Sequence, residues 1–204
     1  VPKEMSHFID WFNDQCSNGN QTITRSVINA AIAHVYFETI HPFEDGNGRI
    51  GRAIAEKVLS LGVGRPILLS LSKVIEANRT DYYEALQKAQ RNYELNMTPW
   101  IVYFTGICLQ AQSSAEDQIS FTLQKTRFFD RYRNQLNERQ LKALNRMLEE
   151  GPDGFEGGMN VRKYIGITKT SKATATRDLQ DLVERGAMCS EGRGRSTKYL
   201  LLLD

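Results

Sequence analysis

Residues 41–52 read HPFEDGNGRIGR, and this stretch decides how the chain around it is organised. The proline at position 42 disfavours helical backbone in the residue before it, so a helix arriving from the N-terminal side ends there. Gly46 and Gly48 follow at the point where a new apolar periodicity begins, and glycine allows the backbone to approach a ligand closely. We therefore expect two helices joined by a loop at residues 41–46.

Apolar residues recur at helical spacing on both sides of this loop. The segment before it predicts a helix over residues 22–40, with a buried stripe of Ile23, Val27, Ile28, Ala31 and Val35. The segment after it predicts a helix over residues 47–61 that ends at Gly62 and Gly64. Further helices are expected at residues 2–16, 71–77, 80–93 and 98–133. Residues 1–133 are therefore predicted to form an all-helical domain.

The pattern changes after residue 134. Capped helices are expected at residues 137–150, 160–165 and 171–185, and two short strands at residues 187–190 and 196–202. Three helices followed by a hairpin is the order of a winged helix-turn-helix domain. The predicted fold class is mainly α-helical: a helical core (1–133) followed by a small winged helix-turn-helix domain (134–204) with a β-hairpin wing.

The composition indicates a soluble globular protein, with 41% hydrophobic and 25% charged residues among 204. Cys16, Cys108 and Cys189 are too few and too scattered for a disulfide framework or a zinc site, which favours a reducing cytoplasm. No apolar run approaches membrane-spanning length, and the first residues do not resemble a signal peptide. Because the sequence does not begin with Met, we expect further residues upstream.

Charge is unevenly distributed along the chain, whose net charge is +2. Residues 1–133 hold 14 Lys and Arg against 14 Asp and Glu, whereas residues 160–200 hold 9 against 4. Any contact with nucleic acid is therefore expected in the C-terminal part.

The loop at residues 41–52 combines groups that suit a polyphosphate. Glycines at a helix N-terminus form a cradle for anions, because unpaired backbone N–H groups and the helix dipole both point there. Arg49 and Arg52 share one face of the helix and can each grip phosphate oxygens. Asp45 offers a hard oxygen ligand for one Mg²⁺ bound with the phosphates. His41 can take the proton from an attacking hydroxyl.

Each of these residues, taken singly, also has a purely structural interpretation. His41 and Pro42 break two helices, Asn47 caps the second helix, and the arginines are solvated on its surface. The structural interpretation is weakened by the combination of base, carboxylate, glycine cradle and two arginines within twelve residues.

The stretch resembles the Fic family motif, His-Pro-Phe-x-Asp/Glu-Gly-Asn-Gly-Arg-x-x-Arg, with no departure at any specified position. The resemblance extends over roughly residues 1–133. It implies a protein adenylyltransferase (an AMPylator, a nucleotidyltransferase) that transfers AMP from ATP to a Ser, Thr or Tyr hydroxyl of a target protein. A few members use related pyrophosphate donors, so the donor stays open, with ATP as the expected co-substrate and Mg²⁺ as the cofactor.

The same resemblance assigns roles to individual residues. It implies that His41 is the general base, that Asp45 is the Mg²⁺ ligand, and that Phe43 anchors the loop in the core. The implied nucleotide-binding residues are Gly46, Asn47, Gly48, Arg49 and Arg52, with the two arginines on the β- and γ-phosphates, and Asn78 and Tyr82 near the base or ribose.

Fic enzymes commonly contain an inhibitory helix with the pattern Ser/Thr-x-x-x-Glu-Gly/Asn, whose glutamate pairs with the second motif arginine, here Arg52. The sequence does not contain this pattern; Thr80 with Glu84 comes nearest, but Ala85 follows. We therefore expect an upstream inhibitory segment, together with the flap that aligns targets, as a missing N-terminal partner of this chain.

The C-terminal segment resembles a winged helix-turn-helix domain that accompanies Fic cores in one bacterial subfamily. The residues expected to contact DNA are Lys169, Thr170, Lys172, Thr174 and Arg177 around the recognition helix, and Arg193, Arg195 and Lys198 on the wing. Winged helices also serve in dimerisation and protein docking, so DNA, another protein and a second copy of the chain all stay open as partners.

Two other functions are open on the sequence. The chain fits a DNA-binding transcription regulator whose Fic core senses a nucleotide, or, in the full-length protein, an enzyme that removes AMP from modified targets. An intact His41 favours the transferase over the sensor, because a sensor needs the phosphate cradle but no base.

Overall fold

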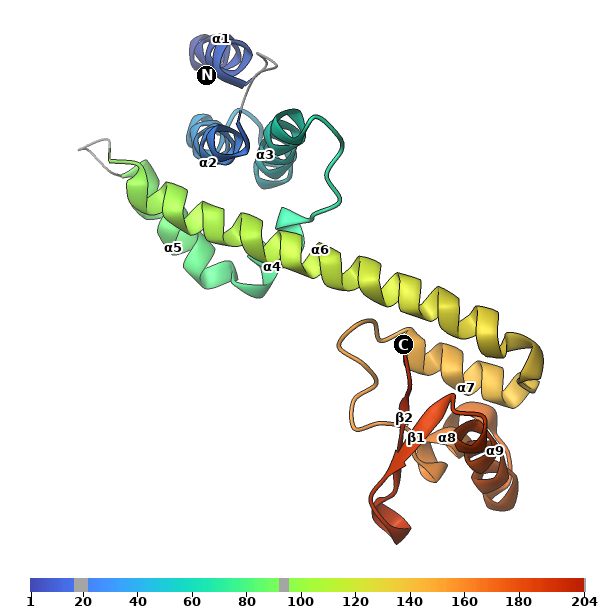
Figure 1. Ribbon diagram of the computed structural model, residues 1–204. Coiled ribbons are helices and arrows are strands. Elements are labelled where there is room, and N and C mark those ends of the chain that lie inside the picture. The colour runs from blue at the N-terminus through green and yellow to red at the C-terminus, as the bar shows by residue number, and fades with distance from the viewer. Residues whose placement is uncertain (17–21, 92–95, 204) are drawn as a thin grey trace. The chain divides into compact units, whose positions relative to one another are not determined.

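The computed structural model describes residues 1–16, 22–91 and 96–203, with no side chain described for Arg195. Helices dominate, and one antiparallel two-stranded hairpin lies near the C-terminus (Figure 1), which confirms the predicted mainly α-helical fold. The chain forms two compact units, Val1–Ala115 and Glu116–Asp204, each with its own hydrophobic core. None of the helices in the described ranges combines the length and apolar character that a membrane span requires.

The first unit consists of helices. They are α1 (Pro2–Cys16), α2 (Ile23–Ile40), α3 (Asn47–Val63), α4 (Leu71–Ala77), α5 (Arg79–Gln90) and the first half of α6 (Thr98–Tyr132). These bounds agree closely with the expected helices, with two differences: α3 continues through Gly62, an expected stop, before Gly64 ends it, and α5 ends earlier than expected. The predicted helix extended to residue 93. Arg91 lies beyond the end of α5, and residues 92 and 93 fall outside the described part of the chain.

Helix α2 lies at the centre of the first unit and contacts α1, α3 and α5 (Figure 1). Because neighbours surround it, its buried side chains occupy several faces and include the polar His34 and Glu38. The predicted single stripe is therefore wrong in part: Val35 is buried, but Ile23 is 65% and Ile28 36% exposed.

Helices α2 and α3 approach most closely where Ser26 faces Gly62. A Cβ atom at Gly62 would lie 1.9 Å from Ser26 Oγ, so only glycine fits at this crossing. Helix α3 then ends at Gly64, whose φ of 71° lies in the left-handed region that glycine adopts without steric cost. Ser26 lies near the start of α2 and Gly62 near the end of α3, so this contact joins the helix ends remote from the 41–46 loop. Toward the loop, Gly51 of α3 packs against Glu38 and His34 of α2.

The second unit contains the rest of α6, three further α-helices and the hairpin. Its elements after α6 are η1 (Arg133–Gln135), α7 (Glu138–Leu148), α8 (Val161–Thr168), α9 (Lys172–Glu184), β1 (Met188–Glu191), η2 (Gly194–Ser196) and β2 (Lys198–Leu201). Asn137, Asn160 and Ser171 each cap the helix that follows by accepting a backbone N–H, as expected from their side-chain oxygens.

The division between the units falls inside α6. Trp100 and Phe104 pack into the first core, whereas Phe121, Phe128 and Tyr132 pack into the second. Packing thus separates the units at residue 115, eighteen residues before the predicted boundary of the catalytic domain. The predicted roles of the two domains stay predictions.

A buried carboxylate ties the helices of the second unit together. Asp178 on α9 is 6% exposed and accepts hydrogen bonds from Arg139 Nε (2.8 Å), Tyr164 Oη (2.9 Å) and Asn137 Nδ2 (3.2 Å). Burial alone would raise the pKa of Asp178, but these hydrogen bonds outweigh it and hold the pKa below its usual value. The network fixes α9 against α7 and α8.

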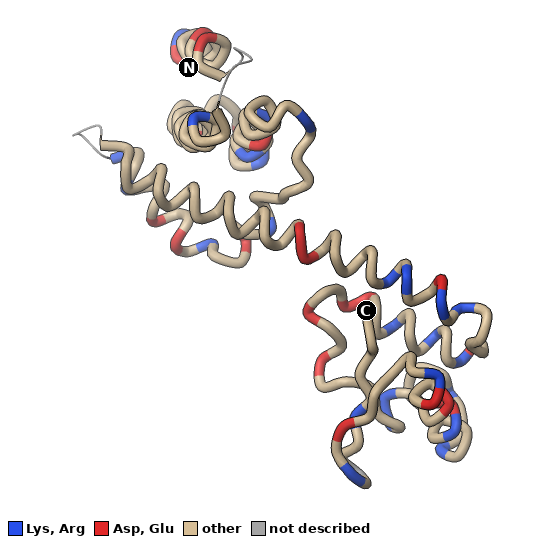
Figure 2. The backbone as a smooth tube through the Cα atoms, in the orientation of Figure 1, with Lys and Arg blue, Asp and Glu red and all other residues tan. Residues whose placement is uncertain are grey.

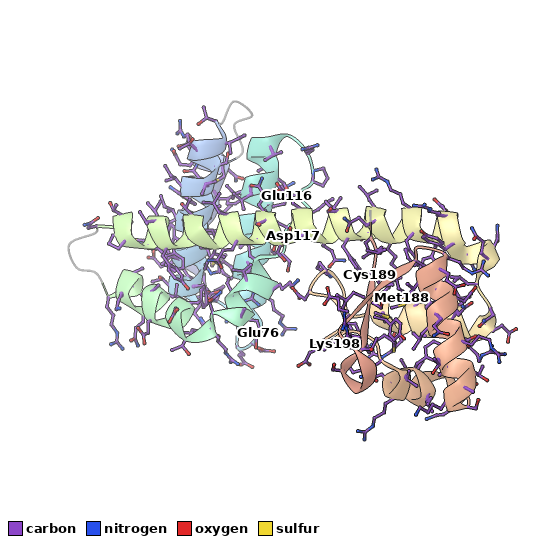
Figure 3. All side chains as sticks on the ribbon, turned by 60° about the horizontal axis from the view of Figure 1, so that its bottom comes forward. Glu76, Glu116, Asp117, Met188, Cys189 and Lys198 are labelled. Atoms are coloured by element: carbon purple, nitrogen blue, oxygen red, sulfur yellow. The ribbon has the colours of Figure 1, made fainter. Side chains whose placement is uncertain are left out.

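The hairpin pairs β1 with β2 in antiparallel register, with Met188 opposite Leu201 and Glu191 opposite Lys198. Figure 3 labels Met188 and Cys189 on β1 and Lys198 on β2. Helix, helix, helix and hairpin follow one another in the predicted order, while the assignment as a winged helix stays a prediction.

Candidate functional site

His41 lies at the junction between α2 and the loop. Its backbone adopts φ 48° and ψ 58°, and its N–H donates to the Phe37 carbonyl at 3.0 Å as the last bond of α2. A left-handed backbone is uncommon for a residue other than glycine, and here the following proline prevents the helix from continuing. The turn leaves the imidazole exposed, beside the loop rather than within the core.

Asn47 holds the loop in shape. It is 3% exposed, its Oδ1 accepts the Phe43 N–H at 3.0 Å, and its Nδ2 donates to the Phe43 carbonyl at 2.6 Å. The Phe43 ring lies 6.3 Å from that of Phe37 but is 49% exposed, so Phe43 does not anchor the loop by burial as predicted. The buried amide of Asn47 clamps the backbone of Phe43 instead, and its side chain is committed to the loop.

The cradle, which we define as Gly46, Asn47, Gly48 and Arg49, consists of the cap residue and the first turn of α3. Gly46 precedes the helix with φ 86°, a conformation that favours glycine. The backbone N–H groups at the start of an α-helix have no acceptor within their own helix, and the helix dipole adds partial positive charge there. The geometry is thus that of an anion site at a helix N-terminus.

Asp45 and Arg49 form an ion pair at the rim of the cradle. Arg49 Nη2 lies 2.9 Å from Asp45 Oδ2, and the side chains are 72% and 91% exposed. Asp45 Oδ1 also accepts the Gly46 N–H at 2.6 Å. An exposed pair of this kind contributes little stability, so either partner can exchange it for a ligand at low cost.

Magnesium fits this rim. Mg²⁺ is usually held by one or two carboxylates together with substrate phosphates, and Asp45 is an exposed carboxylate next to the cradle. Within the described residues, no group of three or more His, Cys, Asp or Glu side chains converges as a protein-only metal site. The rim thus offers the exposed carboxylate of Asp45 to such an ion.

Arg52 lies one turn further along α3 and is held by another helix. Its Nε donates to Ser72 Oγ on α4 at 2.8 Å. A Cβ atom at Gly48 would lie 3.2 Å from Arg52 Nη1, so the guanidinium covers the cradle glycine. Ser72 was not predicted as a site residue, because nothing in the sequence pattern connects a serine near the start of one helix to an arginine on another.

A buried polar pair underlies the cradle. His34 is fully buried, and its Nε2 lies 2.7 Å from Tyr82 Oη. A Cβ atom at Gly51 would lie 2.6 Å from Glu38 Oε1 and 3.1 Å from His34 Nδ1, so both side chains press against α3. Burial lowers the pKa of His34 to about 4 and raises the pKa of Glu38, whereas the charges of His41 and Arg52 act on Glu38 in the opposite direction. His34 and Glu38 are four residues apart on the same helix, and two polar residues at this spacing among apolar ones were the sequence signal that could have pointed to them.

The two outlying predicted residues do not join the loop. Tyr82 is 2% exposed and engaged with His34, so its side chain belongs to the core rather than to a surface open to a nucleotide. Asn78 is exposed at the junction of α4 and α5, where its Nδ2 donates to the Val74 carbonyl at 3.0 Å. Asp45, the cradle and Arg52 lie together at the start of α3, whereas His41 lies at the other end of the loop; the charges of His41 and Arg52 both act on the buried Glu38.

The predicted DNA-contacting residues lie in the second unit. Lys169, Lys172 and Arg177 are exposed at the start of α9 and just before it, and Arg193 and Lys198 are exposed on the hairpin. Lys169 ends α8 with φ 56°, and Thr170 and Thr174 are half-buried beside it. The side chain of Arg195 lies outside the described part. Figure 2 shows Lys and Arg on the helices of this unit, with acidic residues interspersed.

Comparison with known proteins links the loop to one family. Residues 1–59 match the Fic/DOC family. The chain is 29% identical over 103 residues to protein adenylyltransferase fic-1 of Caenorhabditis briggsae, and 32% identical over 90 residues to a probable protein adenylyltransferase of Aquifex aeolicus. It is also 44% identical over 59 residues to a Fido domain-containing protein of Dictyostelium discoideum.

These similarities are partial. They cover 50%, 44% and 28% of this chain, and only 18%, 24% and 37% of the respective relatives. The family match, residues 1–59, lies within the first unit. Residues 1–59, which contain the His41 loop and the cradle, are thus similar to the Fic/DOC family, and part of the chain is similar to protein adenylyltransferases.

Proposed function

We propose that this chain transfers AMP from ATP to a hydroxyl side chain of a target protein. The observation that supports this most directly is that a carboxylate, a glycine cradle and two arginines lie at one helix N-terminus, at the end of a loop that begins with an exposed histidine. The adenylyltransferase relatives support the same chemistry for this segment.

Each group has a role in the proposed reaction. The cradle N–H groups and the arginines bind the phosphates, and Asp45 holds Mg²⁺, which when bound neutralises phosphate charge. The target hydroxyl oxygen attacks the α-phosphorus, its proton passes to His41, and the bond breaks between the α-phosphorus and the oxygen that bridges it to the β-phosphorus. The products are an AMP–protein phosphodiester and pyrophosphate. Catalysis then rests on positioning and charge stabilisation.

The test compares two histidine variants. The chain, its His41→Ala variant and its His7→Ala variant are incubated with Mg²⁺ and α-³²P-ATP alone and with lysate proteins. His7 is a matched control, because it is exposed on α1, 3.8 Å from Glu4 and remote in sequence from the loop. We expect labelling by wild type and His7→Ala, and a loss of at least about 100-fold in His41→Ala. Equal labelling by both variants would exclude His41 as the base.

A second function, in which the chain is a nucleotide-sensing DNA-binding regulator, is favoured by one observation. Lys172 and Arg177 lie exposed on α9, and neither forms an ion pair with any residue that the structure describes. Two cationic side chains on one helix that lack ion-pair partners among the described residues suit contacts with DNA phosphates, and the affinity of such binding for DNA falls as the salt concentration rises. Fluorescence anisotropy with duplex DNA at two salt concentrations tests this. Binding that Lys172→Gln weakens and the α7 control Lys142→Gln leaves unchanged would support it; no salt-dependent binding would exclude it.

A further inference from the structure

The two arginines of the site differ in what holds them. Arg49 pairs with the Asp45 carboxylate, and both side chains are largely exposed. Arg52 is less exposed and is held instead by the neutral hydroxyl of Ser72, at 2.8 Å from its Nε. A hydroxyl fixes the guanidinium without cancelling its charge. Arg52 therefore keeps its full positive charge for an anion.

Ser72 sits on a rigid support. Helix α4 begins with Ser70 as its cap, and the Leu71 N–H donates to Glu56 Oε1 of α3 at 3.0 Å. Leu71 is fully buried and Ile75 is 5% exposed, so the apolar side of α4 is fixed in the first core. The Ser72 hydroxyl thus occupies a set position relative to α3, although its own side chain faces solvent.

The Nε contact leaves the rest of the guanidinium available. Arginine has five N–H donors in a planar fork, of which the Ser72 contact uses the one on Nε. The Nη1 atom lies close to Gly48, because a Cβ atom added at Gly48 would be 3.2 Å from it. A side chain already held in its binding geometry loses less conformational entropy when a ligand arrives.

We propose that Ser72 is a positioning residue that holds Arg52 ready for the terminal phosphates, and so makes the site select a nucleoside triphosphate over a monophosphate. The inference rests on the proposed function, because it takes Arg52 to contact phosphates beyond the α-phosphate. Ser72 itself does not touch the reacting atoms.

The experiment measures equilibrium affinity for Mg-ATP and for AMP by calorimetry in the whole chain. We expect Ser72→Ala to weaken Mg-ATP binding about 3- to 10-fold, within the range of one ordinary intramolecular hydrogen bond, and to leave AMP affinity within about twofold. Ser72→Thr, which keeps the hydroxyl, should restore most of the loss. In an Arg52→Ala background, Ser72→Ala should have an effect of less than about twofold, because its partner is gone.

The matched control is Ser114→Ala. Ser114 also accepts a hydrogen bond from a cation of the first unit, Lys73 Nζ at 3.3 Å, but it lies on α6. This variant should bind both nucleotides like wild type. The proposal is overturned if Ser72→Ala binds Mg-ATP like wild type, or weakens Mg-ATP and AMP equally as a general disturbance of the fold would. A wild type that binds Mg-ATP no better than AMP would overturn this inference while leaving AMP transfer to be judged by the His41 variants.

Discussion

Replacing Gly62 by Ala tests the close packing of α2 against α3, the two helices that the 41–46 loop joins. The new Cβ would lie 1.9 Å from Ser26 Oγ and 2.3 Å from Ser26 Cβ, and the latter atom is fixed to the backbone of α2. Carbon atoms pack at roughly 3.5 Å or more, so α2 and α3 have to separate locally by about 1 Å. Overpacking of this kind costs about 1–3 kcal/mol.

Alanine also favours the helix. Its propensity advantage over glycine is up to about 1 kcal/mol in a helix interior, which offsets part of the clash. We therefore expect Gly62→Ala to lower the free energy of unfolding of the first unit by about 1–2 kcal/mol. Gly106→Ala on α6 is the matched control, because a Cβ there meets no atom within 4 Å. It should stabilise the same unit by up to about 1 kcal/mol.

The assay is urea denaturation followed by tryptophan fluorescence. Both tryptophans of the chain, Trp11 and Trp100, lie in the first unit, so the signal reports that unit alone. Adding Ser26→Gly to Gly62→Ala removes the clashing atoms and should recover much of the loss. A Gly62→Ala variant as stable as Gly106→Ala would refute the close crossing of α2 and α3.

Three further predictions concern buried polar groups. Asp178→Ala should destabilise the second unit by about 2–3 kcal/mol, because Arg139 and the other donors lose their acceptor. Unfolding followed by far-UV circular dichroism measures this. Since folding lowers the pKa of Asp178, the wild type should lose the same stabilisation as the pH falls below about 4. Folding lowers the pKa of His34 to about 4, so the unfolded chain protonates this imidazole at a higher pH than the folded chain does. The free energy of unfolding of the first unit should therefore fall by up to about 3 kcal/mol as the pH is lowered from 6.5 to 4. His34→Gln should flatten this dependence in fluorescence-detected urea titrations, whereas Glu38, with its raised pKa, acts in the opposite sense in both proteins. Asn47→Ala should lower AMP transfer at least about 10-fold with a loss of only about 1–3 kcal/mol in stability, because it frees the loop backbone rather than the core; unchanged transfer would argue against the clamp.

The sequence predicted the local structure around the loop well, because the signals there are strong and local. Proline at position 42, the Gly46 turn and the caps at Asn137 and Ser171 each act on their immediate neighbours, and the helices begin and end near those residues. The ion pair of Asp45 with Arg49 beside Gly46 at the start of α3 follows from the same local geometry.

The remainder depended on tertiary packing, which residue spacing does not encode. Tyr82 looked available to a nucleotide, but α5 turns it toward His34 in the core. Phe43 looked like a core anchor, yet the Asn47 amide takes that role and leaves the ring half exposed. Ser72 lies twenty residues from Arg52, so only the fold shows that they meet.

The most direct test of the central claim, attack on the α-phosphorus, follows two labels of ATP at once. The chain is incubated with Mg²⁺, lysate proteins and a mixture of α-³²P-ATP and γ-³³P-ATP, and protein-bound and released label are counted separately. AMP transfer predicts ³²P on protein and ³³P only in pyrophosphate, both lost in His41→Ala. Protein that retains ³³P and not ³²P would show phosphoryl transfer from the γ-position and contradict the account, as would the absence of protein-bound label of either kind.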